Sequence, residues 1–313
     1  MAIVTKDAYF NSSTGVDKIH CMIWEDDEVK KIGVFQIAHG VSEYIERYDD
    51  FARFLASKGY VVCGNDHLGH GLSVKSAEDL GYFCDRDGDV RLVDDMHILY
   101  LIMHKRYPEL PYFLFGHSLG SMCARVYAAD FGSELNGLIL CGTGELPSAA
   151  ILGEKPMELI AEKLDPRIKF NALSVMKIVD RLTSKEKNEY ADLNWLSYNK
   201  ENIEKYAADP LCGVPLTLAG SRDALSLFNT ACNPEWAKRV PLTLPILLIS
   251  GAKDPVGFNG KGVINVCDNL EMAGHHPEVI LYPGMKHEIL NEDDHIKVYN
   301  DVLIWLSKRT CYA

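Results

Sequence analysis

The residues that could do chemistry begin with a serine set between two glycines. Residues 113–130 read FLFGHSLGSMCARVYAAD, an apolar segment that runs through Gly116, Ser118 and Gly120 into a segment with helical spacing. Glycines on both sides permit a turn too tight for side chains, so the hydroxyl of Ser118 would stand exposed at the start of a helix. The pattern is typical of a nucleophile, although the same serine could serve only as the cap of that helix.

Two later residues could complete a catalytic triad with Ser118. Asp254 lies in LLISGAKDPVG, directly after one apolar run, and His287 lies in ILYPGMKHEIL, directly after the next. A nucleophile at such a turn is followed along the chain by the acid and then by the histidine, on loops after later strands. We expect Asp254 to orient His287, and His287 to take the proton of Ser118 and return it to the leaving group. Candidates in less suitable positions are His275, His276, His295 and Asp223.

Backbone amides near the serine should stabilise a developing oxyanion. The first expected donor is the amide of Leu119, which follows the nucleophile. The second should follow an earlier strand, and the sequence IAHGVSEY places Val41 there. The same segment could also be a simple strand-to-helix turn, with Ser42 or Glu43 in the first turn of the helix.

Strands that alternate with helices must position these residues. Short apolar runs predict strands within residues 18–24, 30–40, 60–71, 111–117, 136–144, 245–254 and 278–287. Helical spacing predicts helices within residues 44–60, 94–108 and 296–309 and after Ser118. This alternation predicts an α/β fold, in which helices cover both faces of a mostly parallel sheet.

One region breaks the alternation. Residues 146–230 show no clear strand, and their helical patterns lie at 157–182 and 201–210. We therefore predict a core formed by residues 1–145 and 231–313, with a helical cap inserted at 146–230 where open α/β sheets bind ligands. The cap has more apolar residues than short exposed helices need, which suits either a small core or an acyl-chain tunnel. They are Met157, Leu159, Ile160, Ile168, Phe170, Leu173, Met176, Ile178, Val179 and Leu182.

Composition and charge exclude several classes of function. The chain has 313 residues, of which 47% are hydrophobic, and this is enough for one large buried core. We expect neither an export signal nor a membrane span. The nine cysteines include no CxxC pair, so we expect thiols in a reducing compartment and a cytoplasmic protein. The net charge of −12 argues against nucleic acid as a partner.

Two motifs suggest metal sites but match them poorly. The sequence DRDGDV, which starts at Asp85, places its glycine too early for a calcium loop, and its acids more plausibly lead into a helix. His67 and His70 have no third zinc ligand nearby in the sequence. We expect no metal and no organic cofactor.

Five motifs, taken together and in order, resemble the monoacylglycerol lipase and lysophospholipase-like branch of the α/β-hydrolases, of the serine aminopeptidase S33 type. They are HGVSEYIERY, NDHLGHGLS, GHSLGS, GAKDPVG and GMKHEIL, and the similarity extends over most of residues 17–308. The resemblance implies an α/β-hydrolase fold, a triad of Ser118, Asp254 and His287, and oxyanion donors at Val41 and Leu119. Where members of this branch often have glycine, this chain has Ser121, which is still small enough for close helix packing.

These observations predict a serine hydrolase that cleaves carboxylic esters through an acyl-enzyme. By resemblance the substrate is a monoacylglycerol or a similar single-chain lipid ester, and the cap would contact a membrane or micelle transiently. The alternatives that stay open are a lysophospholipase, a short-chain carboxylesterase, a thioesterase, and a receptor that keeps the hydrolase scaffold without catalysis. The sequence indicates neither the acyl length, the head group nor the oligomeric state.

Overall fold

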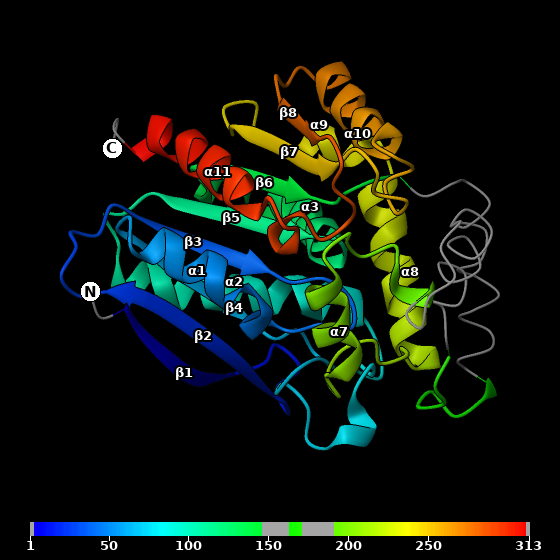
Figure 1. Cartoon of the computed structure of the whole chain (residues 1–313). Helices are drawn as coiled ribbons and strands as arrows, with labels where there is room; N and C mark the ends of the chain where they lie inside the picture. The colour runs from blue at the N-terminus through cyan, green and yellow to red at the C-terminus, as the bar shows by residue number, and fades with distance from the viewer. Residues whose placement is uncertain (1–2, 146–162, 171–190, 311–313) are drawn as a thin grey trace.

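An eight-stranded sheet runs through the middle of the molecule (Figure 1). The computed structural model describes residues 3–145, 163–170 and 191–310. The strand order is β1-β2-β4-β3-β5-β6-β7-β8, in which β1 and β2 are antiparallel to their neighbours and β3 to β8 are parallel. The strands are β1 (Ile3–Asn11), β2 (Lys18–Asp26), β3 (Gly33–Ala38), β4 (Tyr60–Asn65), β5 (Tyr112–His117), β6 (Gly137–Cys141), β7 (Ile246–Gly251) and β8 (Glu278–Tyr282).

Helices cover both faces of this sheet. One face packs against α1 (Asp49–Ala56) and α11 (His295–Thr310). The other packs against α2 (Gly88–Arg106), α3 (Leu119–Phe131), α8 (Leu218–Cys232), α9 (Glu235–Arg239) and α10 (Lys261–Met272). Alternate residues of the central strands supply the two cores: Phe113 and Phe115 of β5 face α1 and α11, whereas Leu114 faces the opposite layer.

The remaining elements are short. They are α7 (Lys200–Ala208) and the 3₁₀ helices η1 (Ile45–Tyr48), η2 (Ala77–Asp79), η3 (Gly132–Glu134), η4 (Ala191–Leu193) and η5 (Ile289–Asn291). Figure 1 shows α7 and α8 beside the sheet edge toward which the arrows of β3 and β7 point. In a parallel sheet this carboxyl edge is where ligands bind.

The α/β fold with a mostly parallel sheet is confirmed, and each predicted strand appears in the sheet. Helices α9 and α10 were not predicted as separate elements, and two further details differ from the predictions. Strand β1 was not predicted, because it lies at the sheet edge, is largely exposed, and lacks a continuous apolar run. The helix predicted for residues 44–60 consists of η1 followed by α1, since a tight 3₁₀ turn often precedes an α-helix.

The predicted cap lies partly within the described residues. Its first helical pattern, residues 157–182, lies mostly outside them, as do Met157, Leu159, Ile160, Leu173, Met176, Ile178, Val179 and Leu182. Ile168 and Phe170 are described, and both are exposed, by 46% and 41%. They flank Lys169, which forms an isolated antiparallel bridge with Thr217 that the sequence did not predict. Helix α8 packs against α2 and α3, so this part of the segment helps to cover the sheet.

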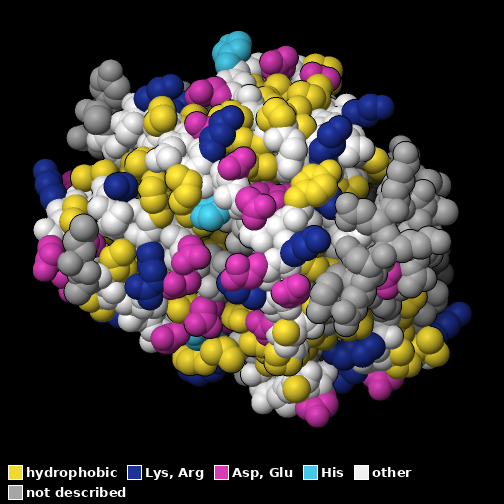
Figure 2. Space-filling view, in the orientation of Figure 1, with side chains coloured by type: hydrophobic (Ala, Val, Ile, Leu, Met, Phe, Trp, Pro, Cys, Tyr) yellow, Lys and Arg dark blue, Asp and Glu magenta, His cyan; other side chains and the backbone are white. Residues whose placement is uncertain are grey.

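The face seen in Figure 2 carries Asp, Glu, Lys and Arg side chains interspersed with small groups of hydrophobic ones. Among the described residues of this face, the basic side chains therefore form no continuous surface of the kind that binds nucleic acid. Among the helices of the described residues, none combines the length and the apolar character that a membrane crossing requires.

Candidate active site

Ser118 lies at a strained turn between β5 and α3. Its backbone has φ 54° and ψ −118°, a conformation that is costly for a residue with a side chain. The turn is tight because a side-chain carbon at Gly120 would lie 2.1 Å from the carbonyl oxygen of Ala38, and one at Gly116 would lie 2.3 Å from that of Gly120. The two glycines thus permit the close approach that the sequence motif predicts.

The turn after β3 lies next to this serine. A side-chain carbon at Gly40 would lie 3.2 Å from Cβ of Ser118, and Val41 follows directly. Leu119 begins α3, so the structure brings the segments of both predicted oxyanion donors to Ser118. The alternative interpretation placed Glu43 in the first turn of a helix, but η1 starts only at Ile45. Instead its carboxylate accepts a hydrogen bond from the amide of Gly40 (2.6 Å).

Asp254 and His287 lie in contact, although 33 residues separate them in sequence. Nδ1 of His287 donates to Oδ2 of Asp254 (2.9 Å), and both side chains are buried. The amide of Val256 donates to the other carboxylate oxygen (2.8 Å) and fixes its orientation. Nε2 of His287 has no hydrogen-bond partner within the described part of the chain. An imidazole held through Nδ1 with Nε2 unpaired has the arrangement of a general base.

The pKa of His287 is raised above its ordinary value of 6.5. Burial of the ring opposes protonation, but the charge of Asp254 and its hydrogen bond outweigh this, and the carboxylates of Glu288 and Glu43 add to the rise. A stabilised imidazolium is what a histidine needs when it takes a proton during a reaction.

Several contacts connect the histidine with the serine turn. The amide of Ser118 donates to the carbonyl of Cys141 (3.0 Å), and a side-chain carbon at the next residue, Gly142, would lie 3.0 Å from the ring of His287. The ring of His117, next to Ser118, lies 4.7 Å from that of His287, centroid to centroid. The indole of Trp195 lies 5.4 Å from the same ring. The serine turn and the His287–Asp254 pair are therefore neighbours at the carboxyl edge of the sheet.

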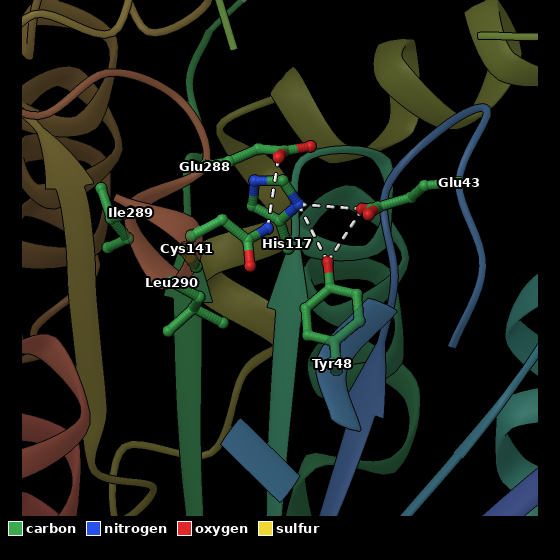
Figure 3. Close-up of a pocket in the computed structure, with 8 residues that line it drawn as sticks. Glu43, Tyr48, His117, Cys141, Glu288, Ile289 and Leu290 are labelled. Carbon is green, nitrogen blue, oxygen red and sulfur yellow. Dashed lines mark hydrogen bonds and ion pairs between the residues drawn. The ribbon is translucent and has the colours of Figure 1, made fainter. Parts of the chain in front are cut away.

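The sequence did not single out three buried polar residues beside this site, Tyr48, His117 and Glu288, and it placed Glu43 only in a possible helical turn. Glu43 and Tyr48 converge on one edge of the His117 imidazole in a small pocket (Figure 3). Glu288 lines the same pocket. Burial tends to raise the pKa of the Glu43 carboxyl, but its hydrogen bond to His117 and the charge of Arg47 lower that pKa by more. The pKa is therefore below its ordinary value, and the carboxyl stays ionised. The available signals were the motifs HGVSEYIERY, GHSLGS and GMKHEIL, in which these residues look like ordinary polar residues of helices and loops.

Neither metal motif gathers a metal site. The described residues contain no group of three or more His, Cys, Asp or Glu side chains placed to hold a metal ion. The DRDGDV sequence leads into α2, as expected. The rings of His67 and His70 are buried beside that of His39, and burial lowers the pKa of each, so they pack as neutral rings. A serine, a histidine–carboxylate pair and nearby amides suffice for nucleophilic acyl transfer.

Residues 30–294 match the family model described as serine aminopeptidase, S33. The chain is similar to human monoglyceride lipase, with 27% identity over 94% of this chain and 88% of that one. It is equally similar to the monoacylglycerol lipase of Mycolicibacterium smegmatis, with 27% identity over 98% of this chain and 99% of the other. Among solved structures, a thermostable carboxyl esterase from Bacillus coagulans in complex with glycerol is 30% identical, with a TM-score of 0.89 over 99% of this chain and 100% of that one.

Proposed function

Because the chain belongs to the serine aminopeptidase S33 family and has the α/β-hydrolase fold, we propose that it is a serine ester hydrolase that acts on monoacylglycerols. The family description names a peptidase, but the relatives reported above are lipases and an esterase. They extend over nearly the whole chain, and this favours an ester substrate over a peptide.

Ser118, Asp254 and His287 are the proposed triad. Ser118 attacks the ester carbonyl while Nε2 of His287 takes its proton, and the amides of Val41 and Leu119 hold the oxyanion. His287 then returns the proton to the departing glycerol oxygen. In the second half, His287 activates water, which releases the fatty acid from Ser118. The hydrogen bond between His287 and Asp254, with Nε2 unpaired beside the serine turn, is the observation that carries this proposal.

The cap, residues 146–230, is proposed to hold the acyl chain. Ile168 and Phe170 present exposed apolar side chains there, and apolar residues from the same segment pack near the histidine. Each buried methylene contributes about 0.8 kcal/mol, so such a surface favours long chains over short ones. In this proposal the cap also touches a lipid surface while substrate enters, and the protein acts in the cytoplasm, as its free cysteines suggest.

A substrate panel tests the proposed function. The purified protein is assayed with monoacylglycerols, lysophospholipids, p-nitrophenyl esters and acyl-CoAs, and Ser118→Ala serves as the blank. We expect the highest kcat/KM with a monoacylglycerol. A clear preference for a lysophospholipid, an acetyl ester or an acyl-CoA would reassign the substrate, and no turnover of any ester would favour a binding protein.

A further inference from the structure

A buried group of charged side chains lies behind the histidine. The guanidinium of Arg47 donates from Nη1 to Glu43 (2.6 Å) and forms a two-pronged pair with Glu288, with both bonds at 2.8 Å. Asn202 completes the group: its amide donates to Glu288 (2.7 Å) and its oxygen accepts from Arg47 (3.2 Å). The carboxylate side chains are 4% exposed and the arginine 10%. We call Glu43, Arg47, Asn202 and Glu288 the carboxylate clamp.

Arg47 lies on η1, and the other three members of the clamp come from three further segments that converge on the site. Glu43 binds the amide of Gly40 and so holds the oxyanion turn, residues 40–43. Glu288 directly follows His287 in the His loop, residues 284–292. Asn202 lies on α7, from which the ring of Tyr206 packs over the guanidinium at 4.9 Å. One guanidinium thus bonds the oxyanion turn and the His loop and connects both to the predicted cap.

Further bonds fasten the His loop to the segment before α7. The amide of Glu288 donates to the carbonyl of Leu196 (2.8 Å). The carboxylate of Glu292 accepts from the hydroxyl of Ser197 (2.8 Å) and from the amide of Lys286 (2.8 Å). The position of His287 in the site therefore depends on contacts with the segment that leads into α7.

If the clamp served only to stabilise the folded state, it would be inefficient. It buries two carboxylates with one guanidinium, and removing these charges from water costs free energy that apolar packing would avoid. What a planar guanidinium adds is direction, because paired bonds fix both the distance and the orientation of a carboxylate. Building on the function proposed above, we propose that Arg47 and Glu288 are positioning residues that hold His287, the oxyanion turn and α7 in register.

The clamp also contributes charge near His287. Apart from Asp254, the groups that face this region come from the oxyanion turn, η1, the His loop and the ends of β5 and β6. They are Glu43, Arg47, Glu288, His117 and Cys141. The carboxylates raise the pKa of His287, so neutralising Glu288 should lower that pKa, and removing the positive charge of Arg47 should raise it.

The test compares Glu288→Gln, Arg47→Met and Arg47→Lys in the full chain, with a short soluble ester that the wild type hydrolyses. We expect kcat to fall by about tenfold or more in each variant, since small misplacements are costly, while KM changes much less. The acidic limb of the pH profile is the range in which kcat/KM falls as the pH decreases. This limb should move to lower pH in Glu288→Gln and to higher pH in Arg47→Met. Arg47→Lys keeps the charge but lacks the planar fork, so it should lose kcat without moving the limb. It also serves if Arg47→Met does not fold.

Glu25→Gln is the matched control. Glu25 is a buried carboxylate on β2 that pairs with Arg106, and it lies outside the proposed site. This variant should keep both kcat and the limb. An NMR titration that follows the Nδ1 proton of His287 compares the same variants without substrate. If the protein hydrolyses no ester, that result contradicts the proposed function, while the titration still tests the positioning role. Unchanged kcat, limb and titration in the clamp variants, or equal losses in Glu25→Gln, would overturn the positioning role.

Discussion

The imidazole of His287 is bound on one side and unpaired on the other. Nδ1 donates to Asp254, whereas Nε2 has no partner among the described residues. At Ser118 the backbone is strained, with φ 54°, and the neighbouring glycines allow no side chain. Strain of this kind persists where the surrounding structure enforces it, often at functional sites. These local features are the ones that the proposed role of Ser118 as a nucleophile requires.

Asp254→Asn should leave the fold intact but reverse the tautomer of His287. The amide would donate to Nδ1, so Nε2 would carry the proton and could not accept that of Ser118. If the serine proteases are a guide, turnover near neutral pH falls by about 10⁴-fold. Asp223→Asn is the control, because this buried carboxylate on α8 already has a pKa raised to about 7 by burial. Ester hydrolysis by the two variants is compared. A larger loss in the control would show that the acid has been misassigned.

The raised pKa of His287 predicts the pH dependence of the reaction. Only the neutral imidazole can accept the proton of Ser118. We therefore expect kcat/KM to be maximal above the pKa of His287 and to decline as the pH falls through that pKa. We expect the acidic midpoint above 6.5, and rates of acid release measured between pH 5 and 9 would locate it. A midpoint below 6.5 would mean that burial outweighs Asp254.

At the scale of elements, parallel strands bring the proposed site residues to one edge of the sheet, and described parts of the segment after β6 contact that edge. Residues 40, 118, 254 and 287 each follow a parallel strand, β3, β5, β7 and β8, whose carboxyl ends meet at one edge. Parts of the predicted cap also reach into this edge, since the amide of Gly213 and the hydroxyl of Tyr206 both donate to the carbonyl of Ser42. If the cap selects the substrate as proposed, these bonds connect it directly to the proposed oxyanion turn.

The apolar side chains of Ile168 and Phe170 should affect long substrates only. Residues two apart in an extended segment share a face, and the backbone of both is held by bonds to Leu216 and Leu218. Ile168→Asn and Phe170→Asn should flatten the rise of kcat/KM with acyl length while leaving hydrolysis of a short p-nitrophenyl ester unchanged. Ile264→Asn, at a similarly exposed position on α10, is the control. Equal losses for short and long esters would show that this face does not bind the acyl chain.

At the scale of the whole molecule, the periodicity of the sequence was enough to predict the parallel strands of the sheet. The order of motifs was enough to indicate that Asp254 and His287, 33 residues apart, are partners. Strand β1 was not predicted, because an exposed edge strand needs no continuous apolar run. The carboxylate clamp was not predicted for a different reason. Arg47 and Glu288 are 241 residues apart, and in its local sequence each looks like a solvated charge. Buried polar pairs between distant segments leave no periodic signal, so only the folded chain reveals them.

Glu25 should make global stability sensitive to acid. Burial raises its pKa, but bonds from Lys6, Tyr107 and Arg106 outweigh this and lower it to about 2, from 4.5. The resulting stabilisation is present above pH 4.5 and is lost as the pH falls toward 2. Denaturant unfolding at pH 6 and pH 3 should show a smaller loss for Glu25→Gln than for the wild type. Equal losses would place the acid sensitivity elsewhere.

The most direct test of the central claim is reaction with a fluorophosphonate probe followed by peptide mapping. The account predicts one adduct, on Ser118, and predicts that Ser118→Ala loses both labelling and ester turnover by several orders of magnitude. An adduct on another serine, or full turnover in Ser118→Ala, would contradict it.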